Sequence, residues 1–302
     1  MITNDKKQLL LANLAVFFAE MFNGLNINAQ KYLLPEWCSS YTMFFLRCAF
    51  AVVAFWLASL FIRKEETTPR DRLHMILIGA IVLSGYIFFY LIGVEYSSPI
   101  DSSLIFTTMP VLVLILSFFV FKEHISGNKL VGIFMGIGGA VWIVMKEDLV
   151  ATRPESITGN VFCFVSALCY AVYLIRNKRY TQKYSSITML KWIFLGAFLV
   201  SSVVVAIKGF ESKIFLETEN MLPLAILIFV LIFPTFLTYL LLAYGLKKLS
   251  TTAVAMYDYE VPIIASSIAL FLGQAKFEWY QLLASMLIFT GVYIVLRETN
   301  RK

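Results

Sequence analysis

One acidic side chain interrupts the first long apolar segment of this 302-residue chain. Glu20 lies within "FFAEMFNGLNINAQKY", and Asn23, Asn26 and Gln30 follow it at spacings of three, three and four residues. On a helix of 3.6 residues per turn, these spacings place the four polar side chains on one face. A carboxylate near the middle of a bilayer costs about 2.5 to 3.5 kcal/mol or more. We therefore expect this face to contact neighbouring helices or a water-filled cavity.

A carboxyl group in such a place can serve two different roles. Held away from water, a carboxylic acid keeps its proton and releases it when a cation or water arrives, so Glu20 is the candidate for proton coupling. Alternatively, a protonated glutamate and neighbouring amides can hold transmembrane helices together. Both interpretations stay open for Glu20 and for Asn23.

Further polar and aromatic side chains fall near the middle of other apolar segments. Tyrosines usually gather at the membrane surface, whereas Tyr86, Tyr170 and Tyr239 lie mid-segment, which indicates an aromatic-lined central pocket. Pro234 removes a backbone hydrogen bond beside Thr238 and predicts a kink there. The candidate substrate-binding residues are Glu20, Asn23, Arg47, Tyr86, Tyr90, Thr107, Tyr170, Tyr173, Thr238, Tyr239, Tyr259 and Glu260.

Two acids two residues apart stand in the segment "YDYEVP". On a regular helix, Asp258 and Glu260 point about 200° apart, so only one can face a central cavity; we expect Glu260, the deeper group. Arg47 is expected to pair with a carboxylate or a carbonyl. If it contacts the substrate instead, its guanidinium suits a carboxylate. Together with Glu20 or Glu260 for an ammonium group, Arg47 would then suit an amino-acid zwitterion.

The composition indicates that these residues lie inside a membrane. Hydrophobic residues make up 60% of the chain and charged residues 15%, whereas soluble domains have about 45 to 50% and 25%. Apolar segments long enough to span a bilayer as helices recur throughout, without the alternation of a β-barrel. We therefore expect an all-α integral membrane protein. The ten predicted transmembrane helices are 9–28, 41–62, 73–93, 100–121, 127–145, 158–175, 187–207, 222–246, 252–272 and 278–296.

The basic residues indicate orientation and exclude several functions. With the N-terminus inside, most of the 25 lysines and arginines fall in inner loops, so we expect both termini to be cytoplasmic. The basic residues are scattered over short loops, which argues against a nucleic-acid partner. The cysteines form no C-x-x-C pair, the two histidines stand in different loops, and no G-x-x-x-x-G-K-[ST] motif occurs. We therefore expect no catalytic residues, no metal, no cofactor and no ATP-driven pumping.

The chain also repeats itself at half its length. A shift of 152 residues superposes 90–113 on 242–265 and aligns several glycines and prolines. The aligned pairs are Gly93 with Gly245, Ser98 with Ser250, Pro110 with Pro262 and Gly139 with Gly291. We expect residues 1–150 and 151–302 to be two five-helix repeats of one membrane domain. Because five is odd, the repeats have inverted topology, an arrangement typical of secondary transporters with a site between the halves.

Small residues in the predicted fifth helix indicate close helix packing. Gly132 and Gly136 form a G-x-x-x-G pattern, and Gly139 continues it. We expect this face to pack within the chain, so that the protein is a monomer. A homodimer through helices 127–145 and 278–296 is the alternative.

Two stretches resemble the drug/metabolite transporter (DMT) superfamily and, within it, the ten-helix EamA-type exporters. They are "NGLNINAQKYLLP" with Arg47, and "SSPIDSSLIFTTMPVLVLILSFFVFKEHISGNKLVGIFMGIGGAVWIV". The positions that match the family pattern are Pro110, Lys122, Glu123, Gly132 and Gly139. The second half departs from it, because Ala275 stands where Glu123 would be repeated and Ala284 where Gly132 would be. The resemblance implies an exporter of amino acids or related small-molecule solutes, surrounded by lipids of the bacterial inner membrane.

Other functions stay open beside amino-acid export. The Ala19-Glu20 pair also resembles the first helix of the small multidrug resistance proteins, which implies that proton and cationic drug alternate at Glu20. A lipid scramblase or flippase would need a groove that opens sideways between helices, and a channel would also use polar stripes. A membrane enzyme is disfavoured, because no cluster of nucleophile, base or metal ligands occurs in the sequence.

Overall fold

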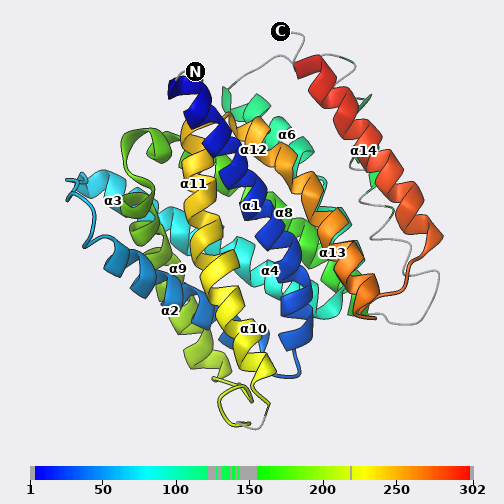
Figure 1. Cartoon of the computed structure of the whole chain (residues 1–302), viewed down its shortest axis with the longest axis horizontal. Coiled ribbons are helices and arrows are strands. Elements are labelled where there is room, and N and C mark those ends of the chain that lie inside the picture. The colour runs from blue at the N-terminus through cyan, green and yellow to red at the C-terminus, as the bar shows by residue number, and fades with distance from the viewer. Residues whose placement is uncertain are drawn as a thin grey trace.

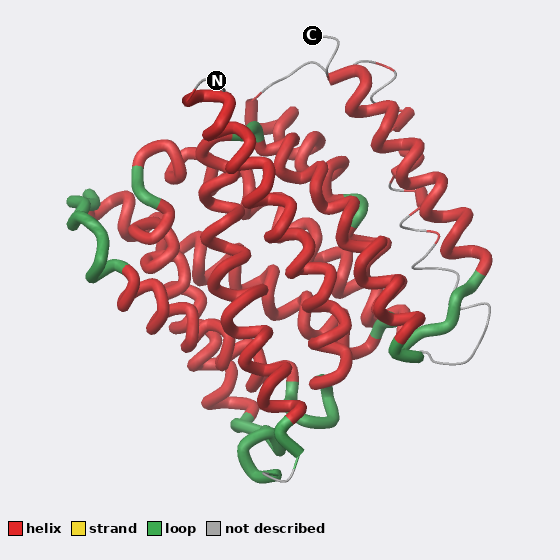
Figure 2. Tube along the Cα trace, in the orientation of Figure 1, coloured by secondary structure: helices red, strands yellow, loops and turns green. Residues whose placement is uncertain are grey.

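The computed structural model of the chain is a bundle of helices (Figures 1 and 2). It describes residues 4–121, 127, 131–132, 134–136, 138–139, 142, 155–217 and 220–299. Among these residues, the only extended pairing is an isolated bridge between Cys38 and Ser212. The predicted roles of Lys122 and Glu123 lie outside the described residues, as does much of the predicted helix 127–145.

Helices of the first half follow one another through short loops. They are α1 (Asn4–Leu33), α2 (Ser40–Ala58), α3 (Pro69–Leu77), η1 (Ile78–Leu83), α4 (Ser84–Tyr96), α5 (Pro99–Phe106) and α6 (Met109–Phe121). The second half has α8 (Glu155–Lys183), α9 (Ser186–Lys208), α10 (Leu222–Val230), η3 (Leu231–Leu237) and α11 (Thr238–Lys248). It ends with α12 (Thr251–Ala255), η4 (Met256–Tyr259), α13 (Glu260–Phe271) and α14 (Trp279–Thr299).

Seven helices among the described residues are long and apolar enough to cross a membrane. They are Lys7–Leu33, Ser40–Ala58, Pro69–Tyr96, Ile157–Lys183, Ser186–Lys208, Leu222–Lys248 and Ala253–Phe271, and a shorter apolar helix covers Pro99–Val113. These helices confirm the all-α class and a multi-pass membrane protein. The number ten and the inverted repeat stay predictions.

Side-chain caps explain where several helices begin. The hydroxyl of a serine or threonine accepts a hydrogen bond from the backbone N–H three residues later, which satisfies one of the free donors of the first turn. The capping residues are Ser39 for α2, Thr68 for α3, Ser98 for α5 and Ser185 for α9. In α3 and α5 a proline follows the cap directly, where its missing N–H costs nothing.

Departures from regular helix recur at corresponding places in the two halves. The π-helical segments η1 and η3 overlap under the shift of 152 residues. Pro234 lies inside η3, so the predicted kink takes the form of a widened turn. The break between α5 and α6 and the 3₁₀ turn η4 also correspond, and each precedes one of the aligned prolines, Pro110 or Pro262.

Glycines allow the closest helix contacts. A Cβ on Gly79 would lie 1.7 Å from the carbonyl oxygen of Ile193, and one on Gly196 would lie 2.0 Å from that of Ile76, so α9 packs directly against α3 and η1. A Cβ on Gly291 of α14 would lie 2.5 Å from the carbonyl oxygen of Gly132. The glycine face of the predicted fifth helix therefore contacts α14 within the chain.

The two ends of the chain lie on the same side of the bundle. In Figure 1, α1 begins and α14 ends at the end marked N and C. Inside the bundle, α1 packs against α11 and α13, while α4 packs against α8. The helices that carry the predicted polar stripe and the predicted tyrosines therefore meet at the centre. The cytoplasmic placement of the termini stays a prediction.

Candidate functional site

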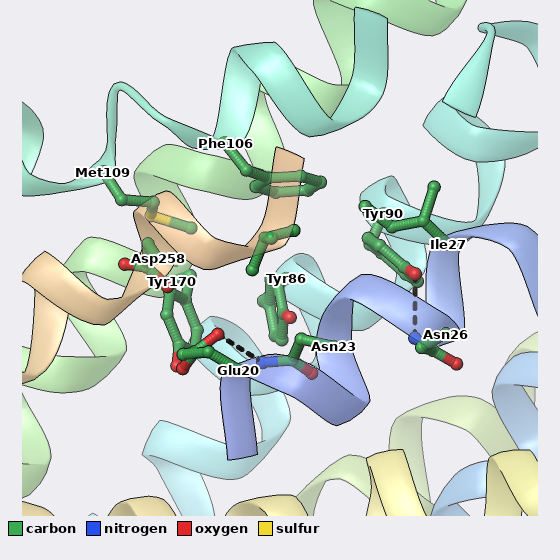
Figure 3. Close-up of a pocket in the computed structure, with 11 residues that line it drawn as sticks. Glu20, Asn23, Asn26, Ile27, Tyr86, Tyr90, Phe106, Met109, Tyr170 and Asp258 are labelled. Atoms are coloured by element: carbon green, nitrogen blue, oxygen red, sulfur yellow. Dashed lines mark hydrogen bonds between the residues drawn. The ribbon is translucent and has the colours of Figure 1, made fainter. Parts of the chain in front are cut away.

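A pocket lies at the centre of the bundle, between helices of the two halves (Figure 3). Its cavity volume is about 30 Å³, room for a water molecule or two. The lining residues are Glu20, Asn23, Asn26, Ile27, Tyr86, Tyr90, Phe106, Met109, Tyr170, Asp258 and Val261. Three members of the predicted polar stripe of α1, Glu20, Asn23 and Asn26, line this pocket, and Gln30 does not.

Two acids dominate the chemistry of this pocket. Glu20 is 1% exposed and Asp258 is 5% exposed, and both line the pocket. Glu20 Oε2 accepts a hydrogen bond from Asn23 Nδ2 at 2.9 Å. Glu20 Oε1 and Asp258 Oδ2 are buried without a hydrogen-bond partner. Adjacent buried carboxylates repel each other, so the pair is suited to hold a proton or a cation.

No basic side chain neutralises these acids within the described part of the chain, where the single ion pair joins Lys183 to Asp71. Lys183 also lies over the ring of Tyr184, whose hydroxyl donates to the same Asp71 carboxylate. The negative charge of the pocket is therefore open to a ligand.

Aromatic rings form the wall beside the acids. The rings of Tyr86 and Tyr170 lie 4.7 Å apart, those of Tyr86 and Tyr90 lie 6.1 Å apart, and Tyr173 stacks behind Tyr170 at 6.0 Å. Tyr90 accepts a hydrogen bond from Asn26 Nδ2 at 2.8 Å. The Tyr170 hydroxyl is buried without a partner. Ring faces next to carboxyl groups suit an organic cation, because both attract positive charge.

Proline places Asp258 at the pocket. Proline lacks an N–H, and its ring clashes with the carbonyl four residues earlier. For Pro110 and Pro262 those positions are Phe106 and Asp258, and both line the pocket. The regular α-helix is interrupted there, by the break after α5 in the first half and by the 3₁₀ turn η4 in the second. Each half therefore contributes the residue at its proline-induced break.

Comparison with known proteins identifies the family. The model of the EamA-like transporter family matches residues 10–145 and 157–297. The chain belongs to the EamA-like transporter family. It is therefore a transporter and not an enzyme.

Relatives of this EamA-family transporter occur in archaea and bacteria. An uncharacterized transporter of Archaeoglobus fulgidus is 24% identical over 303 residues, which cover 99% of this chain and 100% of the relative. The transporter YyaM of Bacillus subtilis is 23% identical, with 90% and 89% covered. An Escherichia coli protein named "Probable amino-acid metabolite efflux pump" is 25% identical, with 75% and 77% covered. One crystal structure superposes with a TM-score of 0.63 at 17% identity, over 96% of this chain and 98% of that one, which shows the fold alone.

Several of the residues predicted from sequence meet in the pocket of this EamA-family protein. Those that line it are Glu20, Asn23, Tyr86, Tyr90 and Tyr170. Two others form a layer behind the wall. Tyr173 stacks on Tyr170, and the ring of Tyr239 meets that of Tyr173 edge-on at 6.1 Å.

Arg47 lies behind the aromatic wall and does not line the pocket. It is 3% exposed, its Nε donates to Thr235 Oγ1 at 2.9 Å, and its guanidinium carbon lies 5.8 Å from the centre of the Tyr90 ring. We expected a carboxylate or a carbonyl as its partner, whereas the hydrogen bond seen in the described part of the chain goes to the Thr235 hydroxyl. The guanidinium lies beside the Tyr90 ring.

The remaining predicted residues lie outside the pocket. Thr107 Oγ1 donates to the Leu104 carbonyl and Thr238 Oγ1 to the Ala19 carbonyl, so both hydroxyls bond to helix backbone. The Tyr259 ring packs 5.5 Å from that of Phe289.

The expectation that Glu260 is the acid facing the cavity is wrong for this pocket. Asp258 lines it and Glu260 does not. The expectation assumed a regular helix of 100° per residue, whereas η4 is a 3₁₀ turn of about 120° per residue. The tighter winding rotates Asp258 toward α1.

Sequence reasoning also missed the apolar lining. Phe106 and Met109 on one side fall on Asp258 and Val261 on the other under the shift of 152 residues. This register, together with the rule that a proline disturbs the helix four residues earlier, could have predicted these lining residues from the sequence. Ile27 gave no such signal, because it is one of many apolar residues on α1.

Proposed function

We propose that this protein is a secondary transporter that exports amino acids or related small metabolites by alternating access around the central pocket. One observation carries the proposal: a pocket between the two halves is lined by two buried acids without a basic partner, by two amides and by a wall of tyrosines. The name of the Escherichia coli relative supports this class of solute.

The chemistry of the pocket favours a solute with an ammonium group. Such a group would neutralise Glu20 and Asp258, and hydrogen bonds between charged groups are the stronger ones. The faces of Tyr86 and Tyr170 would receive the adjoining carbon atoms and part of the positive charge. Arg47, one layer behind Tyr90, would attract the carboxylate of an amino acid toward the opposite end of the pocket.

Alternating access is proposed to use the two halves, 1–150 and 151–302, as inverted repeats. The family model matches each half separately, and the π-helical segments and proline breaks recur at equivalent positions, both of which support this division. Two similar halves can exchange inward-open and outward-open shapes around a site on their common axis. We place both termini in the cytoplasm of a bacterial inner membrane and expect a monomer to suffice.

A proton-coupled exporter of cationic drugs is the second candidate. The position of Arg47 favours it, because the acids and rings line the pocket while Arg47 lies behind Tyr90. In this case a proton and the cationic solute would occupy the Glu20 and Asp258 pair in turn.

Transport by the purified full-length chain in proteoliposomes tests these proposals. The panel contains amino acids, quaternary ammonium compounds and nucleotide sugars, each with and without a proton gradient, and a fluorescent phospholipid as the lipid arm. Amino-acid transport supports the first proposal, and transport of cations alone supports the second. If the phospholipid alone crosses, or no solute does, both are rejected.

The Glu20→Gln variant tests proton coupling separately. Glutamine keeps the shape and the bond to Asn23 but cannot release a proton. Transport by Glu20→Gln that still follows the pH gradient fully would exclude Glu20 as the coupling residue.

A further inference from the structure

A lysine from α1 holds the last turn of α4. Lys31 Nζ donates to three backbone carbonyls, those of Val94 at 3.2 Å, Glu95 at 2.8 Å and Ser97 at 2.7 Å. The last carbonyls of a helix have no partner within it and carry partial negative charge. An ammonium group, with three donors and a positive charge, satisfies both needs. Lys31 therefore fastens α1 to the end of α4.

A second lysine does the same in the other half. Lys178 of α8 donates from Nζ to the carbonyls of Leu246 and Leu249, at the end of α11. The shift of 152 residues superposes Val94 on Leu246 and Ser97 on Leu249. The two lysines thus bind equivalent carbonyls, each within its own half of the chain. We call these two sets of bonds the lysine clamps.

The lysine clamps lie at opposite ends of the bundle. Lys31 is in the last turn of α1. The end of α11 lies instead beside the start of α1, because Lys248 Nζ donates to Gln8 Oε1 at 2.7 Å. At 1.5 Å of rise per residue, the 23 residues from Gln8 to Lys31 separate the clamps by roughly 35 Å. One clamp is therefore near each membrane surface.

The first clamp joins two helices that line the pocket, and the second joins one that lines it to a helix of the layer behind the wall. The first links α1, which carries Glu20 and Asn23, to α4, which carries Tyr86 and Tyr90, and Tyr90 is one turn from Val94. The second links α8, which carries Tyr170, to α11. Opening a path from the pocket to either surface requires these neighbouring helices to separate at that end.

We propose that Lys31 and Lys178 are the gate residues of the two sides, and that each must release its helix end before the pocket opens there. Both clamps are formed in this structure. The long lysine side chain can exchange carbonyls for water at the membrane surface, so the bonds are reversible. This inference requires transport through the pocket but does not depend on which solute crosses.

The test measures access to the pocket from each side of the membrane. In a full-length chain with its four cysteines replaced by alanine, Asn23→Cys provides a reporter thiol in the pocket. Right-side-out and inside-out vesicles are labelled with a membrane-impermeant maleimide. Lys31→Gln should increase the labelling rate about tenfold from the Lys31 side only, and Lys178→Gln from the opposite side only, given the strength of charged hydrogen bonds.

Matched variants separate a gate from a general structural role. Lys213→Gln, near the end of α1, and Lys248→Gln, near its start, remove exposed lysines that hold no helix-end carbonyl and should leave labelling unchanged. Lys31→Met and Lys178→Met keep the apolar stem and should repeat the side-specific result where a glutamine variant does not fold. Unchanged labelling in the clamp variants, or an equal increase from both sides, would overturn the proposal.

The labelling result is independent of the solute panel. Side-specific labelling can be found even if no amino acid crosses, in which case the solute assignment fails and the gates stand. Equal labelling together with amino-acid transport would reject the gates alone.

Discussion

Replacing Asp258 by asparagine should make the protein more stable and less active. In the native chain, Glu20 Oε1 and Asp258 Oδ2 face the same pocket without hydrogen-bond partners. Asparagine cannot carry a negative charge and can donate an N–H to Glu20. A buried polar group left unsatisfied costs about 1 to 3 kcal/mol, so a gain of about 1 kcal/mol is a modest expectation. For a chain of 302 residues, that corresponds to a rise in Tm of roughly 1 to 2 °C.

The same substitution removes half of the negative charge that would hold an ammonium group. Charged hydrogen bonds contribute about 1.5 to 3 kcal/mol, so solute affinity should fall roughly 10- to 150-fold. Opposite changes in stability and function are typical of residues that are kept for binding rather than for folding.

Two measurements check this prediction on the same preparation. Thermal unfolding of the purified variant in detergent gives Tm, and uptake into proteoliposomes gives the apparent affinity for the solute. Glu260→Gln is the matched comparison, because it removes an acid two residues away that does not line the pocket, and its effect on affinity should be smaller. A lower Tm for Asp258→Asn, or a larger loss of affinity for Glu260→Gln, would refute the reasoning.

Three further predictions concern packing, coupling and pH. Gly79→Ala should lower the free energy of unfolding by about 1 to 3 kcal/mol, because the added Cβ would clash with the backbone of α9. A Cβ added at Gly138 would have no atom within 4 Å, so Gly138→Ala should leave the stability unchanged. The Tm of each variant measures the effect. Glu20→Gln should transport, if at all, without response to a pH gradient, as vesicle uptake at two gradients can show. Burial raises the pKa of Glu65, but hydrogen bonds from Ser185 outweigh this and keep the pKa below its usual value. Its contribution to stability is therefore present at neutral pH and lost in acid, so the difference in Tm between the native chain and Glu65→Gln should vanish as the carboxyl is protonated.

Helix positions and the polar stripe could be predicted because they depend on local pattern. The predicted helix 222–246 corresponds to α10, η3 and α11, which together cover 222–248. The stripe that begins at Glu20 could be assigned to one helix face because α1 is regular throughout. Where the backbone is a plain α-helix, a spacing of three or four residues fixes the neighbour relation.

The pattern failed where the backbone is not a plain helix. A regular α-helix predicted that Glu260 faces the cavity, whereas Asp258 lines the pocket. Asp258 belongs to η4, which winds more tightly than an α-helix. Arg47 was assigned correctly to the interior, but its position behind Tyr90 depends on how α2 packs against η3 and α4. A long side chain has many rotamers, and only the surrounding helices select one of them.

The proposed repeat preserves backbone features more strictly than side chains, and this difference suits a transporter. The π-helical segments, the proline breaks and the lysine clamps recur in both halves, so opening at either end requires similar bonds to break and similar turns to deform. The pocket residues do not recur: Glu20 faces Tyr170, and Phe106 corresponds to Asp258. Similar gates keep the two open states close in energy, as alternating access requires. The dissimilar lining surrounds the pocket with unlike side chains from the two halves, so that, under the proposed function, a solute would bind there in one orientation.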